Sequence, residues 1–381
     1  RENDFQVGDP HALYCLPWAD STSRRLRARA AEARADVPLP AAEAICPDET
    51  ELTRGDTFQL LLQLTEKSLA VADESELSPR WRLLETLRQF GHERLVESGE
   101  LDAWRARHLA YFADWAENIT TQLDRGHPLD FRLYMEGELN NLRAALAWAL
   151  DPKANRTDAL RLISAFSLIS LEYSLLKEGE EWVRKMLPLA DQPEHRKWRA
   201  VMLHRGAYLI YLNHWRAGIQ SAYDFVKESE RIARELGDRD LLASAIYHQY
   251  EILVGLEKYE EARLLMEESV EICRATGYQS QLNCSLTALG IVLTKQGKMD
   301  QAMEHIEKAI QVATQIHDLW GQEFSLRTLG TNLRLQKKYP EALKTFTCSL
   351  EVANQMGDRI GVGMILANMS IVTNVLEDYH A

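Results

Sequence analysis

The chain has 381 residues and a formal net charge of -13, because 57 acidic side chains outnumber 44 lysines and arginines. This length allows two or three domains with substantial cores. The acidic balance argues against a dominant surface for nucleic acids or anionic membranes, since a binder of phosphates needs a basic field.

The cysteine pattern and the hydropathy favour a reduced, cytoplasmic setting. Five cysteines, an odd number without CxxC spacing, indicate neither a disulfide framework nor a zinc site. No signal peptide is visible at the polar N-terminus. The most apolar run, residues 160–176, contains Glu172 and is too short and too polar to span a bilayer. We therefore expect no membrane segment and no metal.

Residues 1–36 stay unassigned. Within them, a basic run at residues 24–34 interleaves arginines with alanines. Such a run could bind acidic partners or nucleic acid. Because it has no aromatic side chains on which bases would stack, a solvated helix or linker is the favoured interpretation.

Residues 37–99 predict a small mixed domain. Apolar spacing and turn residues indicate helix, helix, hairpin and helix, at residues 41–45, 57–66, 67–73 with 80–85, and 86–95. The last helix should end near Ser98-Gly99, where glycine stops it. This order is the outline of the second half of a winged-helix domain, so we predict a partial winged helix.

Residues 100–156 are predicted to be linker helices. A second apolar face at residues 139–149 ends before Asp151-Pro152. An aromatic stripe with spacings of three and four is more typical of a core than of a cofactor pocket. Its members are Trp104, His108, Tyr111, Phe112 and Trp115.

The last third of the chain repeats with a period of 40 residues. KYEEA at Lys258, KMDQA at Lys298 and KYPEA at Lys338 stand in one phase, and Gly290 and Gly330 keep it. Self-similarity at such a period is typical of stacked helical repeats. Over residues 157–381 we expect helix pairs at 160–189, 198–236, 241–275, 281–316 and 321–356.

These repeats resemble tetratricopeptide repeats, in an elongated form compared with the usual length of about 34 residues. The predicted fold class is mainly α: a right-handed α-solenoid of tetratricopeptide-like helix pairs after a partial winged-helix domain with a small β-hairpin. Small residues such as Gly290 and Ala302 should let paired helices approach closely. Tyr250, where other repeats have glycine, predicts wider packing.

The predicted last helix, residues 361–376, is almost entirely apolar, and the last repeat is incomplete. A terminal repeat normally carries a polar cap. We therefore expect that the natural protein continues beyond this chain, or that the helix pairs with another molecule, including a second copy.

Several phrases, taken together, resemble the region after the nucleotide-binding core of STAND-class (MalT/LuxR-type) bacterial signalling ATPases and transcription regulators. They are LLLQLTEKSLAVADE, RWRLLETLRQFGHERL, SGELDAWRARHLAYFADWAE and ELNNLRAALAWAL. The resemblance covers residues 37–381.

The family's phosphate-binding loop is missing from this chain. No Gly-x-x-x-x-Gly-Lys-Ser/Thr string occurs, and Gly297-Lys298 is followed by Met299. ATP hydrolysis is therefore not carried over from the family. We expect no cofactor here, and ATP could bind only in an upstream NTPase domain outside the chain.

Stacked repeats form a concave surface lined by their first helices. A protein, a peptide or a small effector is the expected occupant, and Arg327, Arg334 and Lys295 would offer an anion contact. A solvated face without a ligand is the alternative. The resemblance selects these groove positions: Tyr211, His214, Tyr247, Glu251, Thr287, Lys295, Phe324, Arg327, Thr331, Arg334 and Asn368.

No catalytic pattern stands out, because the scattered histidines form no HExxH and no repeated metal-ligand spacing. We interpret the chain as a non-enzymatic regulatory or sensor region of a signalling or transcription-regulating protein. Two alternatives stay open. One is a DNA-binding regulator that uses the winged helix or residues 24–34, and the other is a stand-alone protein-interaction scaffold.

Overall fold

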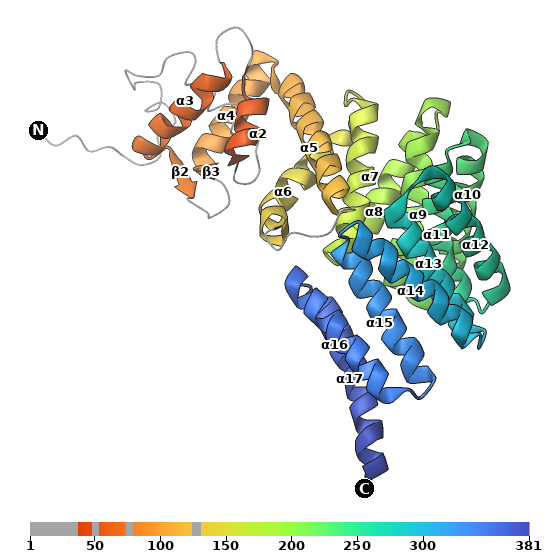
Figure 1. Ribbon diagram of the computed structural model, residues 1–381. Coiled ribbons are helices and arrows are strands. Elements are labelled where there is room, and N and C mark those ends of the chain that lie inside the picture. Colours follow the sequence, from red (N-terminus) through yellow and green to blue (C-terminus); the bar gives the residue numbers. More distant parts are fainter. Residues whose placement is uncertain (1–36, 48–52, 74–78, 124–130, 381) are drawn as a thin grey trace, which may run out of the picture. The chain divides into compact units, whose positions relative to one another are not determined.

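The computed structural model describes residues 37–47, 53–73, 79–123 and 131–380, so the basic run at residues 24–34 lies outside the described residues. The chain divides into two compact units. The first comprises residues 1–112 and 133–155, and the second comprises residues 113–132 and 156–381. Helix α5 (Leu101–Leu123) therefore begins in the first unit and ends in the second (Figure 1).

The first unit contains a three-stranded antiparallel sheet in the order β1-β3-β2. The predicted hairpin is β2 (Ala70–Asp73) with β3 (Arg80–Leu83). β1 (Val37–Pro38), which was not predicted, pairs with the other edge of β3. A two-residue strand leaves no alternating pattern in a sequence, so only its partner reveals it.

Three helices accompany this sheet: α2 (Leu39–Ile45), α3 (Arg54–Glu66) and α4 (Glu85–Ser98). Thr53 and Asp56 form a reciprocal capping box at the start of α3. α4 ends at Gly99, whose φ of 72° is left-handed, as the predicted glycine stop requires.

Two contacts hold the first unit together around β3. Trp81 is 4% exposed and meets Phe58 of α3 edge to face, with 6.1 Å between ring centroids. Arg80 Nη1 lies 2.6 Å from Glu138 Oε1 of α6 (Phe131–Ala149), and both side chains are largely buried. A buried pair of this kind is costly to break from one side, so it joins the sheet to α6.

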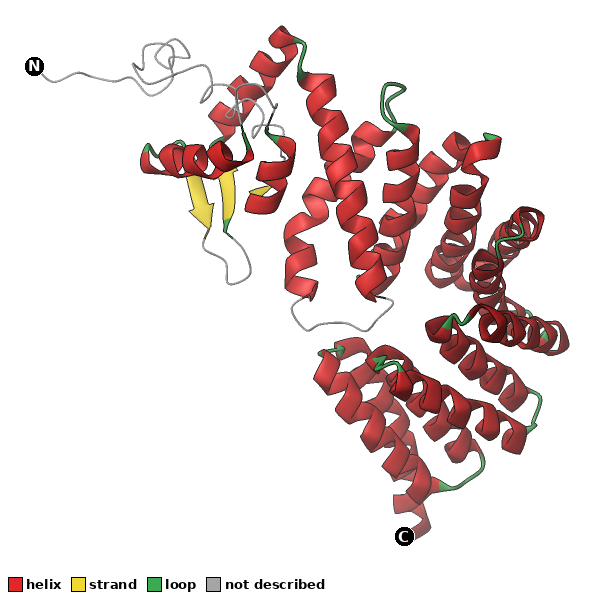
Figure 2. Ribbon diagram, turned by 45° about the horizontal axis from the view of Figure 1, so that its top comes forward, coloured by secondary structure: helices red, strands yellow, loops and turns green. Residues whose placement is uncertain are grey.

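The second unit contains eleven successive α-helices among its described residues, joined mainly by short turns (Figure 2). They confirm the predicted α-solenoid of helix pairs. Their bounds are α7 (Arg156–Glu172), α8 (Leu176–Met186), α9 (Arg196–His214), α10 (Ile219–Leu236), α11 (Arg239–Gly255), α12 (Tyr259–Thr276), α13 (Gln279–Lys295), α14 (Met299–Gln315), α15 (Leu319–Leu335), α16 (Tyr339–Met356) and α17 (Arg359–His380).

Glycine lets the two helices of a pair approach closely. A Cβ atom at Gly290 of α13 would lie 2.4 Å from Ile306 Cγ1 of α14, and one at Gly330 of α15 would lie 2.6 Å from Phe346 Cε1 of α16. The predicted role of small residues is therefore confirmed at both positions. Wider packing at Tyr250, which is 3% exposed, stays a prediction.

The turn after each second helix keeps the 40-residue phase in its backbone. Gly237, Gly277 and Gly357 have φ values of 67°, 75° and 69°, and His317, in the same phase, has a φ of 57°. A left-handed conformation costs a residue with a Cβ about 1–2 kcal/mol. The array imposes this turn even where the sequence offers no glycine.

Helix α17 buries one face and exposes another. Ile365 and Val372 are fully buried with Phe346 of α16. The exposed apolar side chains of α17 are Ile360, Met364, Leu366 and Ile371. By length and composition alone, Arg359–Leu376 could span a membrane, and 17% of this window is buried.

The most apolar run noted in the sequence, residues 160–176, lies mainly in α7, where Leu162, Ile163 and Phe166 are fully buried.

Candidate functional site

A cavity of about 390 Å³ lies in the second unit. Its lining comes from α7, α9, α11, α13, α15 and α17, or from the residue directly before α13 and α15. Among the residues that the structure describes, no side chain of the lining comes from a second helix of a pair. The cavity therefore lies on the face that first helices form in stacked repeats.

Six aromatic rings dominate the lining of this cavity. The rings of Trp320 and Phe324 stack with centroids 5.3 Å apart, and Tyr247 and Tyr250 lie 5.4 Å apart. The full aromatic set is Tyr208, Tyr247, Tyr250, Tyr278, Trp320 and Phe324. Leu168, Leu171 and Met364 add apolar surface. Such a wall suits a ligand group with an apolar or cationic face.

Glu251 of α11 places a partly buried carboxylate in this wall. The Tyr250 hydroxyl donates to Glu251 Oε1 at 3.0 Å, and the Tyr208 hydroxyl also donates to this carboxylate. Burial raises the pKa of Glu251, although the two hydroxyls and the charge of Arg327 act in the opposite direction. The carboxylate is hydrogen-bonded, yet its ionised form is still costly to bury.

Arg327 of α15 is already engaged by its own helix. Its Nε lies 2.8 Å from Glu323 Oε1, and its guanidinium lies over the Phe324 ring at 5.6 Å. Glu323 is 2% exposed and also accepts a hydrogen bond from Ser349 at 3.4 Å. The charge of Arg327 is therefore largely offset before any ligand arrives.

Two further titratable residues of the lining have structural roles. Asp318 caps α15, since its Oδ1 accepts from the Gly321 amide at 2.9 Å, and burial raises its pKa. His248 donates from Nδ1 to the Ser244 carbonyl at 2.8 Å. Burial lowers the pKa of His248 to about 4, so the ring is neutral at pH 7. His248 therefore adds no positive charge.

Four of the eleven predicted groove residues line the cavity: Tyr247, Glu251, Phe324 and Arg327. Lys295 is exposed at the C-terminal end of α13, and Arg334 lies near the end of α15. Neither of them belongs to the lining that contains Arg327. The structure thus does not bring together the three cations of the expected anion contact.

The other predicted positions are occupied by contacts within the array. Tyr211 is 6% exposed and packs against Trp215. His214 Nε2 lies 2.8 Å from Glu180 Oε2. Thr287 is fully buried and donates to the Asn283 carbonyl. Thr331 and Asn368 bond to carbonyls one turn earlier in their helices, those of Arg327 and Met364.

The sequence-based selection missed Tyr208, Tyr250, Tyr278, Asp318 and Trp320. Tyr208 stands 40 residues before His248, which also lines the cavity, so the repeat period marks the two as equivalent positions that the selection left out. The others offered weaker signals. Tyr250 occupies the glycine position, whereas Tyr278, Asp318 and Trp320 lie at helix starts that no groove pattern covers.

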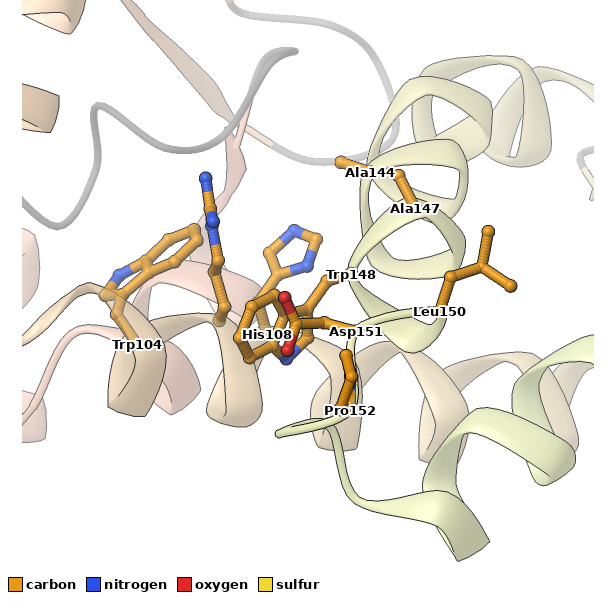
Figure 3. Close-up of a pocket in the computed structure, with 9 residues that line it drawn as sticks. Trp104, His108, Ala144, Ala147, Trp148, Leu150, Asp151 and Pro152 are labelled. Atoms are coloured by element: carbon orange, nitrogen blue, oxygen red, sulfur yellow. The ribbon is translucent and has the colours of Figure 1, made fainter. Parts of the chain in front are cut away.

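A second cavity, of about 440 Å³, lies in the first unit between α5, the end of α6 and the following turn (Figure 3). Trp104 and His108 stack at 5.2 Å between centroids, and with Trp148 all three rings are at least nine-tenths buried. Burial lowers the pKa of His108 to about 3, so the ring is neutral. Trp104 and His108 are buried core residues, as predicted for the aromatic stripe.

Metal ligands do not gather in the part of the chain that the structure describes. In that part, no group of three or more His, Cys, Asp or Glu side chains could hold a metal ion. Cys273, which is fully buried, has a pKa that burial raises to about 11. That thiol is therefore protonated and unreactive at neutral pH.

Comparisons with known proteins agree with the repeat fold of the second unit. Residues 281–373 match the family model of the tetratricopeptide repeat. Proteins that bear the name "Putative HTH-type transcriptional regulator" in Mycobacterium bovis (strain ATCC BAA-935 / AF2122/97) and Mycobacterium tuberculosis (strain ATCC 25618 / H37Rv) are each 37% identical over 202 residues. The match covers 50% of this chain and 22% of each relative, so it spans about a fifth of their length.

Among solved structures, a similar one is that of a signal transduction ATPase with numerous domains (STAND) protein with a tetratricopeptide repeat sensor, from Pyrococcus horikoshii. Its TM-score is 0.52 at 13% identity, and the match covers 93% of this chain and 54% of that chain. At this identity the likeness concerns the fold alone. Residues 281–373 are tetratricopeptide repeats, and the second unit is an α-solenoid of tetratricopeptide-like helix pairs.

Proposed function

We propose that this chain is the non-enzymatic sensor region of a signalling or transcription-regulating protein, and that its repeat array binds a small effector or a segment of a protein. The carrying observation is the 390 Å³ cavity, to which six successive first helices contribute. A ligand that contacts several repeats at once would stabilise one arrangement of the array over others. A cavity of this size suits a small molecule or one or two side chains of a peptide.

We further propose that the first unit is a partial winged helix, and that the whole protein is a STAND-class, LuxR-type regulator in the cytoplasm. The helix, helix, hairpin, helix order with a third strand beside the hairpin supports the winged helix. The printed name of the mycobacterial relatives supports a role in transcription. Any ATP would bind outside this chain, because the phosphate-binding loop is missing.

A ligand screen tests the sensor proposal. Small metabolites and peptides are screened by thermal shift, and hits are measured by calorimetry with the full chain. We expect Phe324→Ala to weaken the binding of true hits, because it removes a ring from the cavity wall. Leu264→Ala is the matched control, since Leu264 is 54% exposed on α12, away from the cavity. Hits that Phe324→Ala leaves intact would refute a site in this cavity.

DNA binding through the winged helix or the basic run is a second candidate, which the name of the relatives favours. It predicts affinity for duplex DNA that falls steeply with salt and is lost when residues 1–99 are removed. The net charge of -13 opposes this function. Affinity for duplex DNA that survives the deletion would refute it.

A further inference from the structure

The unpaired charged groups that line the cavity are carboxylates, whereas the anion contact suggested by the sequence would need unpaired cations. Arg327 supplies a guanidinium, and Glu323 offsets it at 2.8 Å. Two carboxylates of the lining remain, those of Glu251 and Asp318. Neither forms an ion pair with a lysine or arginine among the described residues, and His248 is neutral. When both carboxylates are ionised, they leave an excess of negative charge in the cavity, and burial raises the pKa of each.

The carboxylate of Glu251 is the better placed of the two for a ligand. Asp318 already caps α15 through the Gly321 amide. Among the described residues, the hydroxyls of Tyr250 and Tyr208 donate to Glu251, and both belong to the cavity wall. Hydroxyl donors satisfy the oxygens of a carboxylate but do not neutralise its charge. A cation beside it would favour the ionised form and offset the cost of burial.

The aromatic wall favours the same class of ligand. A ring face attracts a cation within about 6 Å of its centroid, and the attraction is strongest where water is excluded. Trp320 and Phe324 contribute a stacked pair from α15, and Tyr247 contributes a ring from α11. Arg327 already lies over one face of Phe324 at 5.6 Å, so this wall holds a cation within the protein itself.

We propose that the cavity binds an organic cation, whose ammonium group lies against the aromatic wall and beside the Glu251 carboxylate. This inference rests on the proposed sensor function and specifies its ligand class. The ammonium group could belong to a small metabolite or to a lysine side chain of a peptide. Both have the same chemistry, so the test must distinguish the two sources.

Isosteric probes that differ only in charge provide the test. Choline and 3,3-dimethylbutan-1-ol are isosteres that differ only in the positive charge, and 3,3-dimethylbutanoate, which has a carboxylate in place of the alcohol, adds an anion of similar bulk. A peptide with a central lysine, compared with its norleucine counterpart, serves as the second arm. Calorimetry with the full chain should show each cation bound about ten- to thirtyfold more tightly than its neutral partner. The affinities of choline and of the lysine peptide are then compared to identify the source.

Three variants assign the effect to named residues. Glu251→Gln should weaken the binding of the cations about tenfold and leave the neutral probes unchanged. Phe324→Leu keeps bulk but removes the ring, so it should weaken the cations several-fold. Arg327→Gln should preserve or strengthen their binding. Glu341→Gln, on the exposed N-terminal turn of α16, is the control and should change nothing.

The outcomes separate this inference from the proposed function. If the neutral or anionic probes bind as tightly as the cations or more tightly, the proposal that the ligand is a cation is wrong. It is also wrong if Glu251→Gln binds the cations with unchanged affinity. Failure of every cationic probe to bind also overturns it. The sensor function fails on separate grounds, when no ligand of any charge shows binding that Phe324→Ala weakens. Circular dichroism of each variant checks that the helices remain folded.

Discussion

Gly290 lies where α13 and α14 pack without room for a side chain, and Gly290→Ala probes that contact. The added Cβ would lie 2.4 Å from Ile306 Cγ1 and 3.1 Å from the Ala302 carbonyl oxygen. Ordinary carbon contacts begin at about 3.5 Å. Because the Ala302 carbonyl oxygen belongs to the backbone, a rotamer change of Ile306 alone cannot make room for the new methyl group.

The expected free-energy change combines two opposing terms. Overpacking costs about 1–3 kcal/mol, and a clash this short belongs at the upper end. Replacing glycine by alanine inside a helix raises the free energy of unfolding by about 1 kcal/mol through helix propensity. We therefore expect Gly290→Ala to lower the free energy of unfolding by about 1–2 kcal/mol. Gly363 of α17 is the matched control, since a Cβ there meets nothing within 4 Å, and Gly363→Ala should stabilise by about 1 kcal/mol.

Urea unfolding followed by far-UV circular dichroism measures both variants, and equal m values show that the transitions are comparable. The propensity term is shared, so the difference between the two variants isolates the steric cost. Ile306→Ala should then cost less in the Gly290→Ala background than in the wild type, because the clash has been removed. Equal stability of Gly290→Ala and Gly363→Ala would refute the close-packing argument.

Three further predictions concern other parts of the chain. His317→Gly should stabilise by about 0.5–1 kcal/mol, because relief of the left-handed φ of 57° exceeds the added freedom of the unfolded chain; a lower urea midpoint would contradict it. The pKa of buried His108 is about 3, whereas the unfolded value is about 6.5. Below pH 6.5 the unfolded chain thus binds a proton that the folded one does not. Stability should be full above that pH and fall by up to about 1.4 kcal/mol per pH unit towards pH 3, and His108→Phe should flatten this slope in urea titrations at several pH values. The exposed apolar face of α17 should drive self-association, so sedimentation should show a mass that rises with concentration in the wild type and not in Leu366→Lys/Ile371→Lys, whose side chains lie outside the cavity lining. Identical sedimentation of the wild type and the variant would exclude this face of α17 as a self-association surface.

Local patterns were sufficient to predict the helices of the array. A period of 40 residues, small residues such as Gly290 and Ala302, and glycines at the turns depend on contacts that recur in every repeat. β1 could be identified only from the tertiary structure, because its two residues form a strand only by pairing with β3. The same holds for His317, whose φ follows from the turn that its neighbours impose.

The candidate site shows most clearly which features local sequence patterns predict and which features depend on the tertiary structure. The sequence alone determined that first helices would present residues such as Tyr247, Glu251 and Phe324 on one face, because helical spacing and the repeat period are local properties. Only the tertiary structure decided that Glu323 engages Arg327 and that Tyr250 donates to Glu251. A periodic pattern specifies the face on which a side chain lies. The sign of the charge left in a cavity depends on how side chains pair once several helices converge.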